Sequence, residues 1–389
     1  MSATVFDRPF TEPQFDMPDR GIHIVRGREP ILRMQQVLAD FSARCDQTGA
    51  MDDLAYFLSK PGALKKIPYL ILISIGSEPS TKSGENLSAD ELVAALLLYE
   101  HQAAGHGIRI FATDDTTGRR TLVAPPPLRS AVAMIASRKL LDFGARSILI
   151  SFRHVAPTID PSFAGVLQHA TSLSRWATRE RGIVGYLPLE DTFDATLAKI
   201  GQRTRNHLRY YRRRAETQLG CSFSPAVEMD RAEFLALNRE CAYAVPDDVA
   251  GCRYDSLKHL EMPLVMGTRD RDGRWLSLIA GRRHHARMEV HWQMNRSDLP
   301  EHSLSTVMRA YLIEHEISQG TTRLYFEGGT THSMNHSFVP ERSTDLIVMR
   351  RSPFAAVIPT LAKRFLPPEN MLLQVLSDEN LHWHLAGDR

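Results

Sequence analysis

A chain of 389 residues is too long for one ordinary hydrophobic core, so its length favours two domains or three. Hydrophobic residues make up 43% and charged residues 24% of it, a balance that excludes a disordered or fibrous protein and indicates a globular one. The formal net charge of +2 gives no overall field that would favour DNA or an anionic membrane, so any electrostatic preference must be local.

The sequence contains no recognisable export signal or membrane span. The first residues, up to Gly21, mix acids and prolines and lack a basic start followed by an apolar run. The most apolar stretches, Tyr69–Ile75 and Leu92–Tyr99, are far shorter than the roughly 20 residues that cross a bilayer. The four cysteines are scattered and form no CxxC pair, which suits a reducing compartment. The sequence therefore predicts a cytoplasmic protein without a transmembrane segment.

The first elements of the chain are helices and one buried strand. After an irregular lead-in, apolar residues with helical spacing cover 31–44 and 51–58. Pro68–Ser74 is a short apolar run, which is typical of a buried strand. Ser88 and Glu91 have the spacing of a capping box, so we expect a helix to start there and to continue to about Ala104.

Two later segments repeat one order of elements. Residues 109–124 predict a strand, an Asp/Gly turn and a strand, followed by a helix at 129–143, Gly144 and a strand at 145–152. Residues 264–280 again predict strand, acidic-Gly turn and strand, and after an inserted strand come a helix at 305–318, Gly320 and a strand at 321–327. The shared order and turn chemistry predict a structural duplication, and the alternative is two unrelated αβ segments.

The segment between the two copies predicts the domain boundary. A helix over Ala164–Arg181 and a strand over Ile183–Leu189 place it near residues 185–190. We therefore expect an α/β protein with four parts. These are a lead-in with helices at 1–60, a first domain at 61–187, a second domain at 188–351 and an extension at 352–389 that packs on the domains.

A basic segment follows the predicted boundary. Seven Lys or Arg residues and no acid stand between Lys199 and Arg214. On a helix, Arg205, Arg209 and Arg212 share a face, where like charges repel unless water or an anion surrounds them. Guanidinium forks bind phosphate in a bidentate way, so the alternatives are a phosphate-binding helix and a solvated surface helix.

Several features of the second half resemble one known family. A Leu-Pro-Leu strand at 187–189 and a short acidic helix precede Arg205-Asn-His-Leu-Arg209 and further basic residues. Later come the hairpin Gly273–Ala280, the turn Ser303-Leu-Ser305, Gly320 and the strand end Leu324-Tyr-Phe-Glu-Gly-Gly329. This order is similar to that of the FemAB/CelD-like branch of the GNAT superfamily. The resemblance covers about residues 60–345 and implies two tandem GNAT-like domains, each a mostly antiparallel mixed sheet flanked by helices.

The resemblance also implies a reaction. It implies that an acyl group moves from an acyl-CoA-type co-substrate to an amine or hydroxyl of a small molecule or cell-envelope precursor. The chain departs from the family in two places. Asn295–Leu304 contains no Gly, whereas the acyl-CoA branch has a Gly-rich loop that cradles pyrophosphate; Tyr325 stands where the family has Asp, and Met334 where it has Lys. Two alternatives therefore stay open, an aminoacyl-tRNA donor and a non-catalytic protein that binds anions or carbohydrates.

Candidate catalytic and substrate-binding residues lie at the end of a predicted strand. Open αβ sheets bind ligands beyond the carboxyl ends of their strands, where Tyr325, Glu327, Gly328 and Gly329 stand. The Glu327 carboxylate could take the proton of an attacking amine, or only hold the glycine loop. His336 is a second candidate base, with an ordinary polar loop as the alternative. His332 and His336 lack the HExxH pattern of a metal pair, so we expect no metal site.

The remaining candidates bind the donor or line the cleft. We expect the donor's phosphates at Arg203, Arg205 and Arg209 and at the helix start formed by Ser303 and Ser305, because helix N-termini bind anions. His291 alternates with Glu289 and Gln293 in a predicted strand, so these three should share a face, which lines the cleft or meets water.

Overall fold

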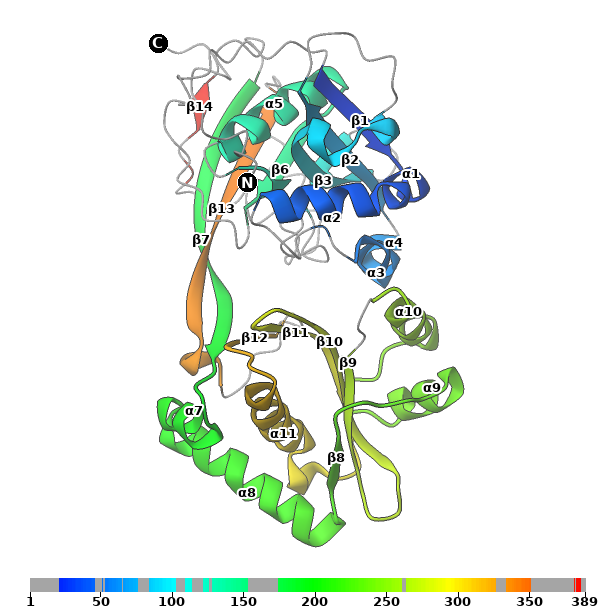
Figure 1. Cartoon of the computed structure of the whole chain (residues 1–389), viewed down its shortest axis with the longest axis vertical. Helices are drawn as coiled ribbons and strands as arrows, with labels where there is room; N and C mark the ends of the chain where they lie inside the picture. Colours follow the sequence, from blue (N-terminus) through cyan, green and yellow to red (C-terminus); the bar gives the residue numbers. More distant parts are fainter. Residues whose placement is uncertain are drawn as a thin grey trace, which may run out of the picture.

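The computed structural model describes residues 21–45, 51, 53–64, 66–75, 84–102, 109–113, 122–125, 128–152, 174–260, 264–326, 334–350, 381 and 383–385. Within these ranges the chain forms two αβ halves, which lie one above the other in Figure 1 and are joined by two long strands.

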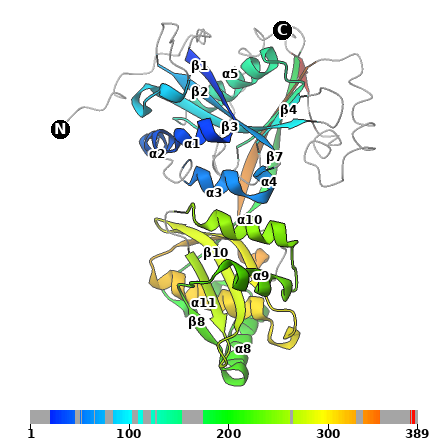
Figure 2. The same cartoon turned by 90° about the vertical axis from the view of Figure 1, so that its right-hand side faces the viewer.

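The N-terminal half is a mixed sheet with helices on both faces (Figure 2). Its strands are β1 (Ile22–Arg26), β2 (Ile67–Ser74), β3 (Leu92–Gln102), β4 (Arg109–Ala112), β5 (Leu122–Val123) and β6 (Ser147–Ser151). Its helices are α1 (Arg28–Arg33), α2 (Gln35–Arg44), α3 (Leu54–Ser59), α4 (Pro61–Leu64) and α5 (Arg129–Asp142), with short 3-10 turns η2 (Gly84–Asn86) and η3 (Ala89–Glu91). Along β2, Tyr69 and Ile71 pack in the core that includes α5, whereas Leu70 and Leu72 pack in the core that includes α1 and α2. Both faces are covered, which explains the continuous apolar run.

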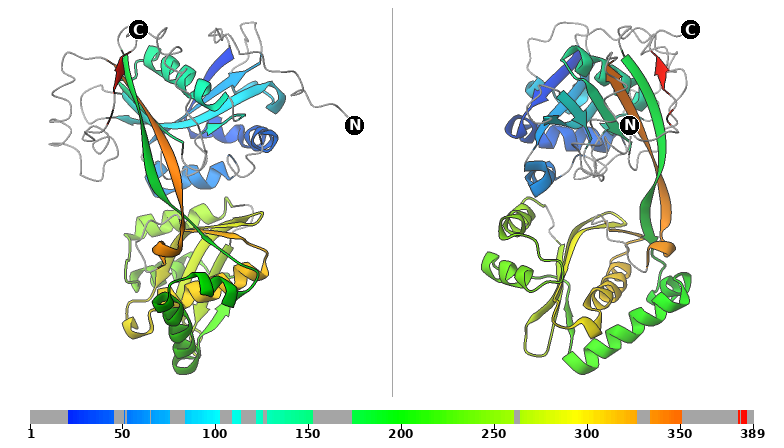
Figure 3. Two further views of the ribbon diagram at one scale, coloured as in Figure 1. Left: turned by 90° about the vertical axis from the view of Figure 1, so that its left-hand side faces the viewer. Right: turned by 180° about the vertical axis from the view of Figure 1, so that it is seen from behind.

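The C-terminal half has the same kind of sheet. Its strands are β7 (Ser174–Pro188), β8 (Ser222–Ser224), β9 (Leu264–Arg269), β10 (Trp275–His284), β11 (Arg287–Asn295), β12 (Arg323–Phe326) and β13 (Val339–Arg350). Its helices are α7 (Phe193–Lys199), α8 (Gln202–Leu219), α9 (Arg231–Arg239), α10 (Asp247–Leu257) and α11 (Leu304–Ser318), with 3-10 turns η7 (Pro300–His302) and η8 (Asn335–Ser337). Helices α8 and α11 cover one face, and α9 and α10 cover the other (Figure 3).

One hydrogen-bonded path runs through both halves, in the order β1-β2-β3-β4-β6-β13-β7-β12-β11-β10-β9-β8. Strands β7 and β13 pair antiparallel along their length, from Arg350 opposite Ser174 to Val339 opposite Tyr186. The halves exchange strands at this ribbon. Strand β13 lies beside β6 of the N-terminal half, and β7 lies beside β12 of the C-terminal half. The long crossing pair is visible at the side of the molecule in Figure 1.

The predicted duplication has a counterpart in the order of strands. Strands β4 and β6 pair parallel with α5 between them, and β11 and β12 pair parallel with α11 between them. Both helices end before a glycine in the left-handed region, Gly144 with φ 99° and Gly320 with φ 75°. The predicted helices at 129–143 and 305–318 and the predicted hairpin at 264–280 are confirmed.

The predicted helix after Ser88 is wrong. Ser88 and Glu91 do form the capping box, but it opens only the short turn η3, and the chain continues as β3. Strand β3 is central, with β2 on one edge and β4 and β5 along the other. An apolar run that is buried on both faces has no periodicity to separate strand from helix.

Two further expectations are corrected by the strand pairing. Strands β4 and β5 do not pair with each other as a hairpin, because they follow one another along the same edge of β3 and both run antiparallel to it. Residues 174–181 were expected in a helix but belong to β7, and 164–173 lie outside the described residues.

The expected domain limits differ from the path of the chain. Strand β1 pairs with β2, so residues before 61 form part of the first sheet. Strand β7 extends from one half into the other, so a boundary at 187/188 falls at its end. Most of the extension at 352–389 lies outside the described residues, but β14 (His384–Leu385) pairs with β7.

Candidate functional site

The sheet opens between β11 and β12. These parallel strands pair only from Arg287 opposite Arg323 to Val290 opposite Phe326, although β11 continues to Asn295. Beyond Val290, no strand of the described residues pairs with this edge of β11. Main-chain N–H groups of a strand edge that has no neighbour are free to meet a ligand. The opening at the carboxyl ends of β11 and β12 is therefore the candidate active site.

A β-bulge accompanies the opening. Ala280 of β10 faces Trp292 and Gly281 faces Val290, so β11 has one residue more than β10, His291. Because of this extra residue, the side chains after the bulge point to the opposite face of the sheet from the one that regular alternation would give them. Val290 packs in the core under α11, whereas Trp292 packs in the core under α9 and α10. Gly281 is required here, because a Cβ on it would lie 2.0 Å from the Glu289 carbonyl oxygen.

The bulge corrects the expectation that Glu289, His291 and Gln293 share a face. The His291 ring packs against Tyr56 and Phe57 of α3, with ring centroids 5.0 and 5.5 Å apart. Gln293 instead points to α11, where its Nε2 donates to the Ser305 carbonyl oxygen over 3.3 Å. His291 therefore lies at the contact between the two halves, on the sheet face opposite α11.

An ion cluster lies on the same face as His291. Arg282 of β10 donates from Nη1 to Asp53, 2.7 Å away in the N-terminal half, and from Nε to Glu289, 3.0 Å away. The Arg282 side chain is only 6% exposed, and the two carboxylates raise its pKa despite the burial that opposes the charged form. The sequence analysis missed this cluster, because a single Arg within a strand has no motif.

The start of α11 was expected to bind the donor's phosphates. Ser303 is the residue before the helix, in the left-handed region with φ 46°, and its side chain caps no backbone N–H. Its hydroxyl instead lies 2.9 Å from the Thr306 hydroxyl. Ser305 is the second residue of α11 and is half-buried.

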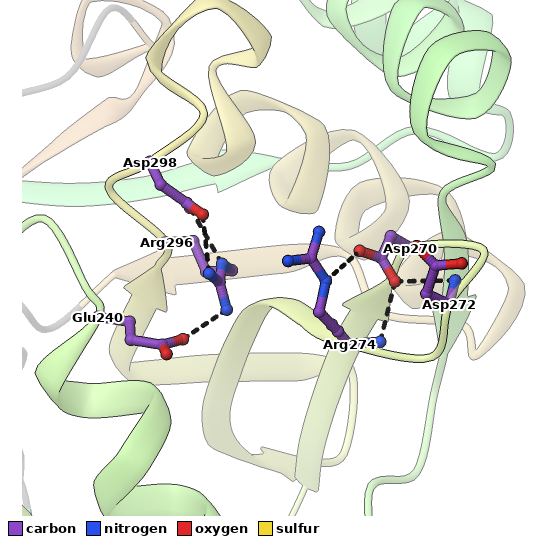
Figure 4. Close-up of polar contacts among 6 residues, drawn as sticks. All are labelled: Glu240, Asp270, Asp272, Arg274, Arg296 and Asp298. Carbon is purple, nitrogen blue, oxygen red and sulfur yellow. Dashed lines mark hydrogen bonds and ion pairs between the residues drawn. The ribbon is translucent and has the colours of Figure 1, made fainter.

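The loop that leads into α11 is acidic. Arg296 binds Asp298 through Nε and Nη2, at 3.0 and 2.7 Å, and also binds Glu240 (Figure 4). The hydrogen bonds from Arg296 hold the pKa of Asp298 below its ordinary value, so it is a carboxylate at neutral pH. Glu301 adds a third carboxylate, and Pro300 has no N–H to donate. This loop differs in charge and donors from a glycine-rich pyrophosphate cradle.

A second arginine lies beside this loop. The Arg274 side chain donates from Nε to Asp270 over 2.8 Å, and the Asp270 carboxylate also accepts from the backbone N–H groups of Asp272 and Arg274 (Figure 4). These contacts close the β9–β10 turn at Gly273, whose φ is 82°. They explain the acidic-Gly turn as a structural feature of the hairpin.

Part of the basic helix α8 is neutralised within the protein. Arg212 pairs with Glu216 and Glu314, at 2.9 and 2.7 Å, and Arg209 pairs with Asp194 at 2.6 Å. Among the described residues, by contrast, no acid pairs with Arg203, Arg205 or Arg213. Arg203 and Arg213 are exposed and Arg205 is half-buried. The helix packs on the protein through its buried residues Thr204, Leu208 and Ala215.

The structure does not bring the two expected phosphate contacts together. Leu219, at the end of α8, packs in the same apolar cluster as Leu304, at the start of α11. Arg205 is 14 residues before Leu219 in one helix, which is about 21 Å along its axis. Arg203 is farther still, and Arg209 is about 15 Å away. One phosphate group cannot contact these arginines and Ser303 or Ser305 at the same time.

His336 lies at the other end of α8. It is exposed, and its Nε2 is 2.8 Å from the position that a Cβ on Gly201 would take. The residues on either side, Met334 and Phe338, are buried in the core under α8 and α11. His336 is thereby held next to the helix start that contains Arg203 and Arg205.

Of the candidate residues at the end of β12, the structure describes only Tyr325. Tyr325 is 4% exposed, and its hydroxyl donates to Glu341 over 3.1 Å, while Leu324 and Phe326 on either side pack toward α11. Glu327, Gly328 and Gly329 lie outside the described residues.

The described ranges contain neither a metal-binding cluster nor a membrane-spanning helix. No group of three or more His, Cys, Asp or Glu side chains there is arranged to hold a metal ion. None of the helices in this part of the chain has the length and apolar character that a bilayer crossing needs.

Comparison with known proteins gives no relative by sequence. No protein-family model matches the chain, and no curated protein sequence is similar to it. Solved structures are similar. FemX shares 9% identity, covers 82% of this chain and 96% of its own, and superposes with a TM-score of 0.53. A conserved protein of unknown function from Bacteroides thetaiotaomicron VPI-5482 shares 10% identity, covers 82% and 97%, and has a TM-score of 0.50. L-PGS from Bacillus licheniformis shares 12% identity, covers 87% and 98%, and has a TM-score of 0.47.

The chain therefore shares its fold with FemX. The superposition on FemX extends over most of both chains, and the resemblance to the FemAB-like branch is confirmed at the level of fold. The fold class expected from the sequence, an α/β protein with two halves of mixed sheet and flanking helices, is confirmed.

Proposed function

We propose that the protein is an acyltransferase and that transfer takes place at the opening between β11 and β12. The observation that carries this proposal is the bulged strand β11, whose edge pairs with no strand of the described residues after Val290. The fold that the chain shares with FemX supports it. The proposed reaction moves an acyl group from an activated donor to an amine or a hydroxyl.

The opening supplies two things that acyl transfer needs. The carbonyl oxygen of the donor gains negative charge as the nucleophile attacks, and the N–H groups of β11 beyond Val290 can stabilise that charge. The strand edges also hold donor and acceptor in line, which replaces an encounter in solution by a positioned reaction. Proton removal from the attacking amine is assigned to Glu327 or His336, and the transfer needs no covalent intermediate.

Two classes of acyl donor are candidates for this site. An acyl-CoA-type co-substrate is our first candidate, but the loop that would hold its pyrophosphate has two carboxylates of its own, Asp298 and Glu301. Its guanidinium, that of Arg296, is already bound to Asp298 and to Glu240 of the neighbouring α9 end. Carboxylates repel phosphate, so such a donor needs another anchor. We place this anchor at the start of α8, and the position of Arg203 and Arg205 near His336 supports it.

An aminoacyl-tRNA donor is the second candidate, and one observation favours it. Arg203, Arg205 and Arg213 have no acid partner among the described residues, and they are spread over ten residues of one helix. From Arg203 to Arg213 they span about 15 Å along the helix axis, which is longer than one pyrophosphate and favours an extended anion such as a nucleic-acid backbone.

A binding experiment separates the donors. Binding of acetyl-CoA and of a charged tRNA is measured from 50 to 200 mM salt, for the wild type and for the triple variant R203Q/R205Q/R213Q. For tRNA we expect a steep loss of affinity with salt, and a slope reduced by about 2 to 3 in the triple variant, since each phosphate contact contributes roughly 0.7 to 0.9. The control is R239Q, an exposed arginine of α9 that already pairs with Asp247.

Activity tests the transferase itself. The wild type, H336A and E327Q are incubated with acetyl-CoA or charged tRNA and a panel of amines and alcohols, and acylated product is followed by mass spectrometry. We expect product from the wild type and a loss of about 100-fold or more in the variant that lacks the base. If no acyl donor binds and no product forms, the proposal is wrong and a non-catalytic binding protein replaces it.

A further inference from the structure

Arg309 is placed over the opening in the sheet. It belongs to the second turn of α11, one helical turn after Ser305, whose carbonyl oxygen accepts a hydrogen bond from Gln293 of β11. The Arg309 guanidinium carbon lies 5.5 Å from the centre of the Phe326 ring, at the last residue of β12. Helix α11 therefore spans the gap, with Ser305 above the β11 side and Arg309 above the β12 side.

The surroundings of Arg309 are apolar. Met308, Leu312 and Ile313 of the same helix are fully buried, and the Phe326 ring stacks on Phe338 with centroids 6.0 Å apart. The arginine itself is half-buried, and this burial lowers its pKa to about 10.

Apart from the face of the Phe326 ring, nothing in the described part of the chain compensates this charge. No acid there contacts the guanidinium, and the buried Nε of Arg309 donates to no acceptor in the structure. Two arginines of strand β10 differ. Arg282 and Arg283 each bind a carboxylate that is at most 1% exposed. A half-buried guanidinium without a partner is costly, and such a cost is usually found where a ligand supplies the missing charge.

We infer that Arg309 binds a carboxylate of the substrate and that this carboxylate stands next to an apolar or aromatic group, which packs on Phe326 and Phe338. The inference rests on the proposed function, because it takes the opening between β11 and β12 as the place where the substrate binds. It makes the substrate an acidic molecule that is anchored inside the cleft.

A carboxylate fits this position better than a phosphate. One guanidinium has one positive charge and a planar pair of donors, which match the single charge and the two oxygens of a carboxylate. A phosphate with nearly two charges needs further cations or helix N–H groups. Arg309 is the sixth residue of α11, so the N–H groups of its own turn are already bonded within the helix.

The test measures binding without turnover. The probe is 4-fluorophenylacetate, and its neutral twin is 4-fluorophenylacetamide; both are titrated by 19F NMR against the full-length wild type, R309M, R309K and R253M. Arg253 on α10 is the matched control, because burial also lowers its pKa and no acid of the described residues pairs with it, but it lies beside Tyr56, on the other face of the sheet.

We expect the wild type to bind the carboxylate at least tenfold more tightly than the amide. R309M should weaken binding of the carboxylate about 10- to 100-fold, R309K by less because Lys keeps the charge but not the fork, and R253M by less than twofold. The melting temperature of R309M should rise, since Met fills the same space without a buried charge. Equal binding of acid and amide, or equal loss in R309M and R253M, overturns the inference.

Two further outcomes are decisive. A fall in the melting temperature of R309M, or its failure to fold, shows that an acid of the chain neutralises Arg309, and the substrate carboxylate is then excluded. Tighter binding of inorganic phosphate than of 4-fluorophenylacetate, lost in R309M, shows a phosphate site instead. Because no step of this test needs acyl transfer, a negative result leaves the transferase proposal standing, and an inactive protein can still show the carboxylate site.

Discussion

Replacing Arg282 by Met removes the guanidinium that joins the two halves and leaves two carboxylates without it. The side chain of Glu289 is 1% exposed and that of Asp53 is 12% exposed, so water cannot take over the role of the arginine at Glu289. Removal of one partner from a buried ion pair costs about 3–5 kcal/mol. We expect the free energy of unfolding of R282M to fall by this amount.

Two further variants separate the contribution of the Asp53 contact from the cost of leaving Glu289 without its arginine. D53N removes only the contact between the halves and keeps Glu289 with its arginine, so its loss should be about 1.5–3 kcal/mol, as for a hydrogen bond to a charged group. The double variant R282M/E289Q removes the stranded charge as well as the guanidinium. The stability loss of this double variant should be smaller than the sum of the losses in R282M and in E289Q, because the two side chains contact each other.

Urea unfolding is the assay, followed by far-UV circular dichroism and by tryptophan fluorescence. Trp275 and Trp292 report on the C-terminal half, and Trp176 reports on the ribbon between the halves. The matched control is R239M, which breaks the exposed pair with Asp247 and should change stability by at most about 0.5–1 kcal/mol. A loss below about 1 kcal/mol in R282M would refute the reasoning, since it would mean that water reaches Glu289.

Three other predictions concern single residues. Burial lowers the pKa of His284 to about 4 from an ordinary 6.5, so on acidification the unfolded chain takes up a proton at this residue before the folded protein does. The stability that depends on neutral His284 is therefore complete above about pH 6.5 and is lost toward pH 4. Between these pH values the free energy of unfolding of H284N, measured by urea titration, should fall by about 1–2 kcal/mol less than that of the wild type. G281A places a Cβ against the Glu289 carbonyl oxygen and should cost about 3 kcal/mol, whereas G251A meets only the movable end of the Arg231 side chain and should cost under about 1 kcal/mol. Burial alone would raise the pKa of Glu100, but hydrogen bonds from Arg109 and Tyr69 outweigh it and hold the pKa low. The stability that ionised Glu100 contributes is therefore present above about pH 4.5 and is lost as the pH falls. In E100Q the free energy of unfolding, followed by circular dichroism, should depend less on pH in the acid range than in the wild type.

The sequence was sufficient where local chemistry decides the structure. The helix before Gly144 and the helix before Gly320 were predicted, because both combine an amphipathic pattern with a residue that accepts a positive φ. The β9–β10 hairpin was predicted from its acidic-Gly turn, and the structure shows Asp270 closing that turn.

Long-range pairing explains the errors. Residues 174–181 are a strand because β13, more than 160 residues later, pairs with them, and no local pattern contains that information. The apolar run of β3 became a strand for the same reason, with neighbours on both edges.

The candidate site could be predicted only in part. The helix α11 and the strand ends around it follow from the sequence, and so does the unusual loop without glycine before the helix. The bulge at His291 could not be predicted, because it exists only in the register between β10 and β11. Arg282 and Arg309 were missed, because an isolated arginine gives no signal until its neighbours are known to be buried.

The exchange of β7 and β13 has a consequence for biosynthesis. The edge of β6 in the N-terminal half is covered by β13, whose last residue, Arg350, comes 199 positions after Ser151. At a synthesis rate of about 5–20 residues per second, roughly 10–40 s pass between the synthesis of β6 and that of the strand that covers its edge. Until then it presents unpaired N–H and C=O groups, which are a template for aggregation. The first half of this protein should therefore need protection by a chaperone during synthesis, because its sheet cannot be completed before β13 of the C-terminal half has been made.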